Sequence, residues 1–197
     1  MYNDVVNHKT VMTSGKIIGF DMDGVLVDHS TNRVRLAAEL GYNIALEQTP
    51  SEIFRTLVPD DIGRGIQIKL YDDRSIALTP PLIVGCEDGL YTIKNSGAKI
   101  FLISRRKNPA VAIELLQIRG LWPKFFNEGN TFFVSKPEDK NKKAIELGIT
   151  YYVDDETRVL EALNSVENRF LFDPFDVFAD STFTRYSKWP DLVRGLI

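Results

Sequence analysis

The chain has 197 residues and a formal net charge of −3, with 44% of its residues hydrophobic and 26% charged. This length fits one globular domain with room for a modest insertion, and the weak negative charge argues against a nucleic-acid partner or an acidic membrane surface. A single cysteine, Cys86, excludes an internal disulfide and a multi-cysteine zinc site, and it favours a reducing, cytoplasmic location. No apolar run is long enough to cross a membrane.

Residues 1–15 are interpreted as a polar N-terminal extension. They include His8 and Lys9 but neither an apolar segment nor a small-residue cleavage pattern, so they differ from a secretory signal peptide. The folded core is therefore expected to begin near residue 16.

Five short apolar runs have the length of buried parallel strands. They cover residues 16–22, 98–103, 131–134, 150–153 and 169–172. Helical patterns lie between them: one begins at Asn108-Pro109 and ends at Gly120, and another covers residues 140–147 before Gly148. Strands that alternate with helices predict an α/β fold, in which helices cover both faces of a parallel sheet and make three layers.

The segment from residue 29 to residue 81 interrupts this alternation. It contains three helical stretches, at residues 32–40, 51–57 and 60–71, but no comparable buried strand, and Pro80-Pro81 marks its end. We therefore expect a small, mainly helical insertion at residues 29–81, with the core domain built from residues 16–28 and 82–197.

Asp21 and Asp23 lie at the end of the first predicted strand and precede Gly24, which permits a sharp turn. Because side chains alternate along a strand, both carboxylates can point to one space while Met22 packs the other way. Ligands of open α/β sheets bind beyond the carboxyl ends of the strands. Two converging carboxylates repel one another unless a cation lies between them, and a divalent ion with oxygen ligands suits this position. A simple acidic turn is the structural alternative.

Polar residues also follow three later strands. They are Ser104 after the second strand, Lys136 and Lys140 after the third, and Asp154-Asp155 after the fourth. A serine hydroxyl can donate to a phosphate oxygen, and a lysine can neutralise a carboxylate and a phosphoryl group. Singly, each residue has a structural explanation as a loop cap, a helix cap or a solvated lysine. Together and in this order, they indicate a phosphate-binding site.

Four segments resemble the motifs of the haloacid dehalogenase-like hydrolases. They are FDMDGVLVD at residues 20–28, ISRR at residues 103–106, a lysine before a helix, and YVDD at residues 152–155. The resemblance extends over roughly residues 17–172. It implies a Rossmann-like core, Mg²⁺ as the cofactor, and a cap, formed by the insertion, that selects the leaving group.

The resemblance also implies that Asp21 is a nucleophile that becomes phosphorylated, and that Asp23 protonates the leaving oxygen and then activates water. It assigns Mg²⁺ to Asp21, the backbone carbonyl of Asp23 and an acid of the last motif. Asp155 is favoured as the direct ligand, and Asp154 as an indirect one. An acid at the position of Asp23 favours phosphoryl transfer, because relatives that cleave carbon–halogen bonds lack it.

Phosphate contacts follow from the same resemblance. Ser104 is expected to hold a phosphoryl oxygen, helped by backbone amides near Met22 and Arg105. Lys140 is preferred as the active-site lysine, and Lys136, which begins a Lys-Pro dipeptide, is the alternative.

The expected function is hydrolysis of a phosphomonoester on a small metabolite, either a nucleotide or a sugar phosphate. The chain is also similar, more weakly, to the small cytosolic 5'(3')-deoxyribonucleotidases in its length, its DGVLVD segment and its Trp189-containing tail. Phe54 and Tyr71 are candidate base-stacking residues, although aromatics at helical positions more often pack in a core. Arg105 and Arg106 either form salt bridges at a helix entrance or contact a second anionic group of the substrate.

Two alternative functions stay open: phosphotransfer to an acceptor other than water, as in a mutase, and phosphate binding by a non-catalytic scaffold. Such a scaffold is expected to have lost one of the motif acids. Asp21, Asp23 and the later acidic pair are all present, which favours an active enzyme.

Overall fold

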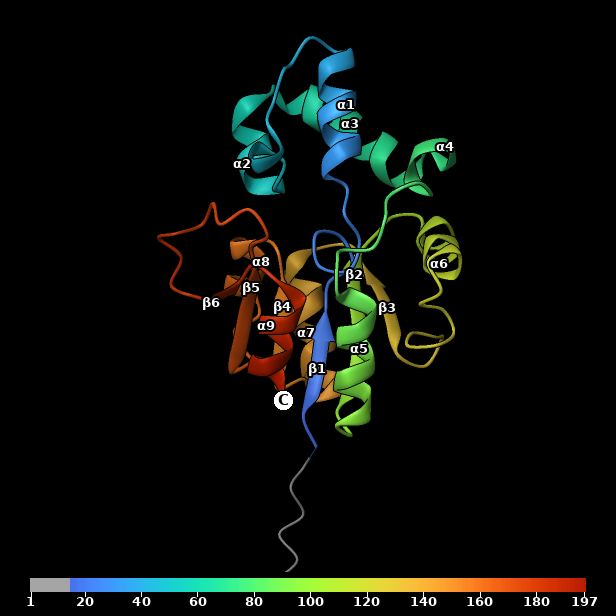
Figure 1. The fold of residues 1–197 in the computed structure, drawn as a ribbon, viewed down its shortest axis with the longest axis vertical. Coiled ribbons are helices and arrows are strands. Elements are labelled where there is room, and N and C mark those ends of the chain that lie inside the picture. The colour runs from blue at the N-terminus through green and yellow to red at the C-terminus, as the bar shows by residue number, and fades with distance from the viewer. Residues whose placement is uncertain (1–14) are drawn as a thin grey trace, which may run out of the picture.

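The computed structural model describes residues 15–197, so the predicted extension at residues 1–15 lies outside the described residues, apart from Gly15. Six strands form one parallel sheet in the order β3-β2-β1-β4-β5-β6 (Figure 1). The strands are β1 (Ile17–Phe20), β2 (Lys99–Arg105), β3 (Thr131–Val134), β4 (Tyr151–Asp154), β5 (Asn168–Phe172) and β6 (Thr184–Tyr186). The predicted α/β class is confirmed.

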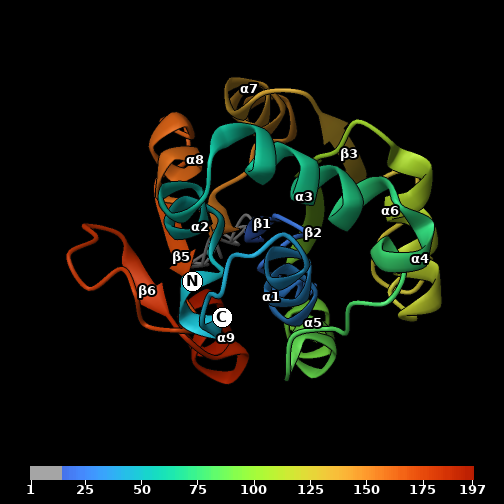
Figure 2. The ribbon, with the colours of Figure 1, turned by 90° about the horizontal axis from the view of Figure 1, so that it is seen from above.

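Helices cover both faces of the sheet, which gives the layers seen from above in Figure 2. One face is covered by α5 (Cys86–Asn95), α6 (Pro109–Ile118) and α9 (Trp189–Leu196), and the other by α7 (Pro137–Leu147) and α8 (Thr157–Ala162). Each face buries its own apolar cluster against the strands. The expected three-layer, Rossmann-like core is therefore confirmed.

The central strand β1 sets the direction of the side chains that follow it. Ile18, Phe20 and Met22 are fully buried in the apolar cluster that includes α5 and α9, while Ile17 packs against the opposite cluster. The same alternation turns Met22 away from Asp21, which lies just beyond the strand and lines a pocket.

Four α-helices and one short 3₁₀ helix lie between β1 and α5 in the chain. They are α1 (Ser30–Glu39), η1 (Leu46–Gln48), α2 (Ser51–Leu57), α3 (Asp60–Asp72) and α4 (Arg74–Ala77). These helices lie over the carboxyl ends of the strands (Figure 1) and bury a third apolar cluster of their own. We call residues 29–81 the cap. Its division from the core as a separate domain stays a prediction.

Several polar contacts join the cap to the core, among them contacts at α2 and at the end of the cap. Glu52 of α2 accepts hydrogen bonds from the backbone amides of Thr157, at 3.2 Å, and Arg158, at 3.0 Å, in the first turn of α8. Arg119, which follows α6, donates to the Pro80 carbonyl at the end of the cap at 2.7 Å. These contacts hold the cap over the strand ends.

Four short elements are not indicated by the sequence pattern: η1, α4, β6 and α9. β6 has only three residues, Thr-Arg-Tyr, and lacks the apolar run that marks the other strands. α9 has only eight residues, and a helix this short is stable only because its apolar side packs on the sheet. In residues 15–197, no helix is long and apolar enough to cross a membrane.

Trp189 secures α9 to the centre of the sheet. Its ring is fully buried and stacks on Phe20 with the ring centroids 5.7 Å apart, and its Nε1 donates to the Val25 carbonyl at 2.9 Å. α5 leaves room for this ring at Gly89, where a Cβ atom would lie 2.4 Å from Trp189. α9 therefore forms part of the core and supports the loop that follows β1.

We expect Trp189→Phe to lower the free energy of unfolding by about 2 kcal/mol, because the change leaves the Val25 carbonyl without its donor and removes part of a buried ring. Urea unfolding followed by circular dichroism measures this loss. Ile145→Ala, at an exposed position on α7, is the control and should change the same free energy by less than about 0.5 kcal/mol. Equal losses in the two variants would contradict the role given to Trp189.

Candidate active site

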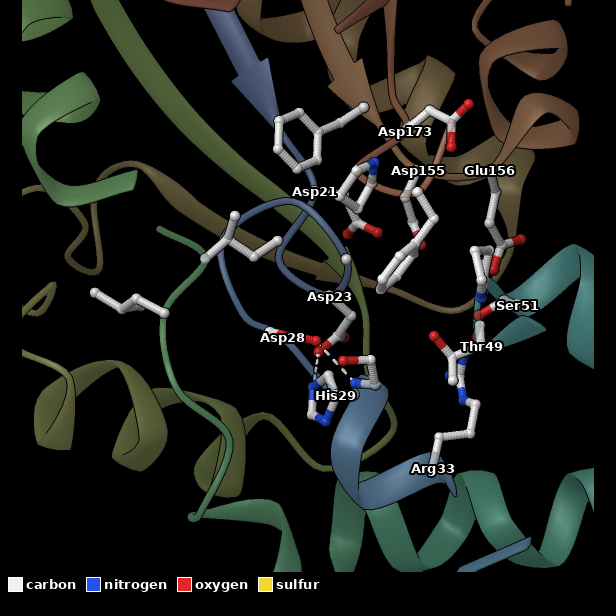
Figure 3. Close-up of a pocket in the computed structure, with 18 of the residues that line it drawn as sticks. Asp21, Asp23, Asp28, His29, Arg33, Thr49, Ser51, Asp155, Glu156 and Asp173 are labelled. Carbon is white, nitrogen blue, oxygen red and sulfur yellow. Dashed lines mark hydrogen bonds and ion pairs between the residues drawn. The ribbon is translucent and has the colours of Figure 1, made fainter. Parts of the chain in front are cut away.

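The chain turns tightly after β1 and places Asp21 in the wall of a pocket (Figure 3). The amide of Val27 donates to the Met22 carbonyl at 3.0 Å, which closes the loop. Gly24 has a φ of 76° in this loop, a conformation that glycine adopts at no steric cost. The Asp21 amide donates to the Val153 carbonyl of β4 at 3.0 Å, so the backbone of Asp21 is fixed to the sheet.

Lys140 is the fully buried cation of this site. Its Nζ lies 3.0 Å from Asp21 Oδ1 and donates to Asp154 Oδ2 at 2.7 Å. Burial alone would lower the pKa of Lys140, but the charges of Asp154 and Asp21 raise this pKa well above its ordinary value. Lys136, by contrast, is exposed at the N-cap of α7 and has no ion pair in the described part of the chain. The geometry therefore favours Lys140 over Lys136 as the lysine of the site.

Asp21, Asp154 and Asp155 bring carboxylate oxygens within 4.8 Å of one another. Both oxygens of Asp154 are engaged, because Oδ2 meets Lys140 and Oδ1 accepts from the Glu156 amide at 3.1 Å. Asp155 instead lines the pocket with Asp21. Burial and the charges of Asp154, Glu156 and Asp21 raise the pKa of Asp155 well above its ordinary value. Three acids beside one lysine leave a net negative charge that a divalent cation with oxygen ligands would balance.

Two further features fit a bound cation. Asp21 Oδ1 is buried and has no aligned hydrogen bond from any residue between 15 and 197, although Lys140 Nζ is close to it. A Cβ atom on Gly24 would lie 2.2 Å from Asp155 Oδ2, so the absence of a side chain at Gly24 gives Asp155 its place. The residues present therefore fit a Mg²⁺ site formed by Asp21 and Asp155, while Asp154 is engaged by Lys140.

Ser104 lies near the end of β2 and lines the same pocket as Asp21. It is 1% exposed, and its Oγ has no hydrogen-bond partner among the described residues. A buried hydroxyl without a partner is costly, and a phosphate oxygen would satisfy it. Among the backbone hydrogen bonds of residues 15–197 outside the regular elements, none starts from the Met22 amide, so this donor is also free.

Asp23 accepts two hydrogen bonds at the same oxygen, Oδ1, from Arg106 Nη2 at 2.6 Å and from His29 Nε2 at 2.7 Å. Burial raises the pKa of Asp23, but Arg106 and His29 outweigh it and hold this pKa below its ordinary value. Burial also lowers the pKa of His29, more than Asp23 raises it, so the ring is neutral and donates from Nε2. Asp23 is therefore a carboxylate that is fixed at one oxygen.

Arg105 and Arg106 both have acid partners. Arg105 Nη2 lies 3.2 Å from a Glu156 oxygen, and Arg106 Nη2 lies 2.6 Å from Asp23 Oδ1. Of the two interpretations of these arginines, the geometry therefore favours salt bridges. Arg105 also lines the pocket.

Glu156 is a residue of the site that the sequence pattern does not indicate. It is 6% exposed and also pairs with Arg55 of the cap helix α2 at 3.2 Å. Burial raises the pKa of Glu156, but Arg105, Arg55 and Arg158 lower it to about 2. Its partners Arg105 and Arg55 lie 51 and 101 residues earlier in the chain, so only the fold reveals this network.

The pocket has a volume of about 610 Å³ and is lined by both the core and the cap. This size suits a small molecule. Tyr71 lines the pocket, but the Arg106 guanidinium lies 4.0 Å from the centre of its ring. Phe54 is 4% exposed within the apolar cluster of the cap. Of the two candidate base-stacking residues, Phe54 is therefore a core residue, and the Tyr71 ring is already covered on one side.

No protein-family profile matches the sequence, and no curated protein sequence is significantly similar to it. A haloacid dehalogenase-like protein of unknown function from Agrobacterium tumefaciens aligns with a TM-score of 0.63 and 19% identity, over 92% of this chain and 97% of its own. A predicted phosphoglycolate phosphatase from Haemophilus somnus aligns with a TM-score of 0.61 and 14% identity, over 93% and 98%. A protein from Thermotoga maritima, provisionally named a β-phosphoglucomutase, aligns with a TM-score of 0.58 and 16% identity, over 92% and 100%.

The chain has the haloacid dehalogenase-like fold. The resemblance to the haloacid dehalogenase-like hydrolases is thereby confirmed at the level of the fold. Identities of 14% to 19% in these alignments support a shared architecture and not a shared substrate. Within that architecture, the motif residues of this chain meet at the carboxyl edge of the sheet, where ligands of open α/β sheets bind.

We expect Lys140→Met to lower the free energy of unfolding by about 3–5 kcal/mol, because it leaves Asp154 buried without its counter-charge. Urea unfolding at neutral pH, with circular dichroism as the readout, measures the loss. Lys136→Met is the matched control on the same helix, and its exposed side chain should make the change smaller than about 0.5 kcal/mol. A larger loss for Lys136→Met than for Lys140→Met would contradict the geometry.

Proposed function

We propose that this protein is a Mg²⁺-dependent phosphomonoester hydrolase that acts on a small phosphorylated metabolite and uses Asp21 as its nucleophile. The observation that carries the proposal is the setting of Asp21. Lys140 lies against one of its oxygens, Asp155 is close by, and the unpartnered hydroxyl of Ser104 lines the same pocket. This arrangement offers a nucleophile, balancing charge and a hydrogen-bond donor to one phosphoryl group.

The proposed reaction has two steps. Asp21 attacks phosphorus, the ester P–O bond breaks, and Asp23 gives a proton to the leaving oxygen. Water then attacks the phosphorus of the aspartyl phosphate, Asp23 takes a proton from that water, and the bond to Asp21 breaks to release phosphate. Ser104 donates to a phosphoryl oxygen in both steps, and Lys140 keeps Asp21 in position.

Arg106 and His29 orient Asp23 for these proton transfers. Both bind Oδ1, so Oδ2 is the oxygen that remains available to the leaving group and to water. In the arrangement of the structure Asp23 is ready to act as a base. Before it acts as an acid, Asp23 takes up a proton from solvent on Oδ2, because Arg106 and His29 occupy Oδ1. The proton that Asp23 takes from water in the second step restores this form for the next cycle.

Asp21, Asp155 and the backbone carbonyl of Asp23 are the proposed ligands of Mg²⁺. When bound there, the ion supplies positive charge that lets an anionic carboxylate approach an anionic phosphate. Phosphotransfer to an acceptor other than water would share the first step and differ in the second. Release of phosphate therefore distinguishes a hydrolase from a mutase.

We expect the wild-type protein to release phosphate from p-nitrophenyl phosphate and from members of a panel of sugar phosphates and nucleoside monophosphates. Release should need Mg²⁺ and stop with EDTA. Asp21→Asn should abolish it without changing the circular dichroism spectrum, because an amide cannot act as the nucleophile. Asp180→Asn, in an exposed loop, is the control and should retain full activity.

Three outcomes would count against this proposal. Full turnover by a folded Asp21→Asn variant would contradict the nucleophile, and turnover that EDTA leaves unchanged would contradict the metal. Isomerisation of a sugar phosphate without net phosphate release would identify a mutase in place of a hydrolase.

We expect Gly24→Ala to weaken Mg²⁺ binding by roughly tenfold or more, because its Cβ atom would displace Asp155 and because alanine disfavours a positive φ. Isothermal titration with MgCl₂ measures the affinity without requiring turnover. Gly65→Ala is the control, because a Cβ atom there meets no atom within 4 Å. Equal Mg²⁺ affinity in the wild type and in Gly24→Ala would remove Asp155 from the proposed ligands.

A further inference from the structure

The cap side of the pocket holds a buried arginine without an acid partner. Arg33 of α1 is 8% exposed and lines the same pocket as Asp21. Within residues 15–197, no Asp or Glu side chain forms an ion pair with it, whereas Arg105 in the same pocket pairs with Glu156. Lys188 also lines the pocket, but it is exposed, so water solvates its charge.

Neutral groups hold the Arg33 side chain in place. Nη1 donates to the Thr49 carbonyl, and the guanidinium lies 5.4 Å from the centre of the Phe54 ring. Nε and Nη2 donate to no acceptor in the described part of the chain. Figure 3 shows Arg33 beside Thr49 and well separated from Asp21. The contacts therefore fix the position of the charge without neutralising it.

Burying a charge without a counter-charge is unfavourable, and buried arginines are normally paired. An arginine that stays unpaired in a pocket wall is readily explained if a ligand brings the anion. The guanidinium fork is well matched to carboxylate and phosphate oxygens. Ser51, two residues after Thr49, also lines the pocket. Its hydroxyl has no hydrogen bond among the described residues and offers one more donor.

We infer that the substrate of the proposed phosphatase carries a second anionic group on its leaving group, a carboxylate or a further phosphate, and that Arg33 binds this group. The inference rests on the proposed function, since it takes the transferred phosphoryl group to lie at Asp21. It favours phosphorylated carboxylic acids and bisphosphates over simple sugar monophosphates and nucleoside monophosphates, whose leaving groups carry no second acid. A pocket of about 610 Å³ accommodates either favoured class.

Matched pairs of substrates test the inference directly. 3-Phosphoglycerate and glycerol 3-phosphate differ by a carboxylate, and fructose 1,6-bisphosphate and fructose 6-phosphate differ by a phosphate. We expect wild-type kcat/KM to favour the member with the second anion in at least one pair by roughly tenfold or more, the factor that one charge-assisted hydrogen bond supplies. The pair that shows the preference identifies the anion.

Variants of α1 assign the preference to Arg33. Arg33→Met should reduce the ratio within the preferred pair to about one, and Arg33→Lys, which keeps the charge but loses the fork, should give an intermediate ratio. Arg35→Met is the matched control on the same helix, with a side chain that is 50% exposed, and it should keep the wild-type ratio. Circular dichroism of each variant verifies its fold.

Separate readouts distinguish failure of the inference from failure of the proposed function. Mg²⁺-dependent hydrolysis of p-nitrophenyl phosphate with no preference in either pair would overturn the inference and leave the phosphatase in place. A preference that persists in folded Arg33→Met would also overturn it. If no substrate is hydrolysed, isothermal titration measures binding instead. The inference requires wild type to bind 3-phosphoglycerate more tightly than glycerol 3-phosphate, or fructose 1,6-bisphosphate more tightly than fructose 6-phosphate. It also requires Arg33→Met to lose that difference in affinity.

Discussion

The buried contact of Lys140 with Asp21 and Asp154 is the interaction on which the site depends. A lysine ammonium at 0% exposure is stable only because two carboxylates surround it. This contact joins α7 to the ends of β1 and β4, so it fixes the relative position of three elements. It also keeps Asp154 engaged and leaves Asp155 to face the pocket. The different roles proposed for Asp154 and Asp155 therefore follow from the position of the buried Lys140.

The cap adds a second layer of electrostatic control. Asp23 is bound by Arg106 from the core and by His29 from the start of the cap, and Glu156 is bound by Arg55 of the cap and Arg105 of the core. Both carboxylates thus link the two parts of the chain, Glu156 through ion pairs to both parts and Asp23 through an ion pair to the core and a hydrogen bond from the neutral His29 ring. Arg33 is the contrasting case, since it lines the pocket without an acidic partner among residues 15–197. Ion pairs therefore stabilise the site, and the charge of Arg33 is proposed to bind an anionic group of the substrate.

Much of this arrangement is predictable from the sequence, because local rules govern it. Short apolar runs mark five of the six strands, and Asp21, Ser104 and Asp154 each lie at the end of such a run. What the sequence does not reveal depends on contacts between distant segments. The choice of Lys140 over Lys136 needs the rotation of α7 against the sheet. The ion pairs of Glu156 need partners 51 and 101 residues away. The lack of an acidic partner for Arg33 likewise becomes visible only in the fold of residues 15–197.

The most direct test of the central claim is to look for phosphate covalently bound to Asp21. Asp23→Asn should slow hydrolysis of the aspartyl phosphate, because the base that activates water is lost. Acid quenching of this variant during turnover, followed by proteolysis and mass spectrometry, is expected to find the phosphate on the peptide that contains Asp21. Phosphate on another residue, or phosphate release with no phosphorylated peptide at any time after mixing, would contradict the account.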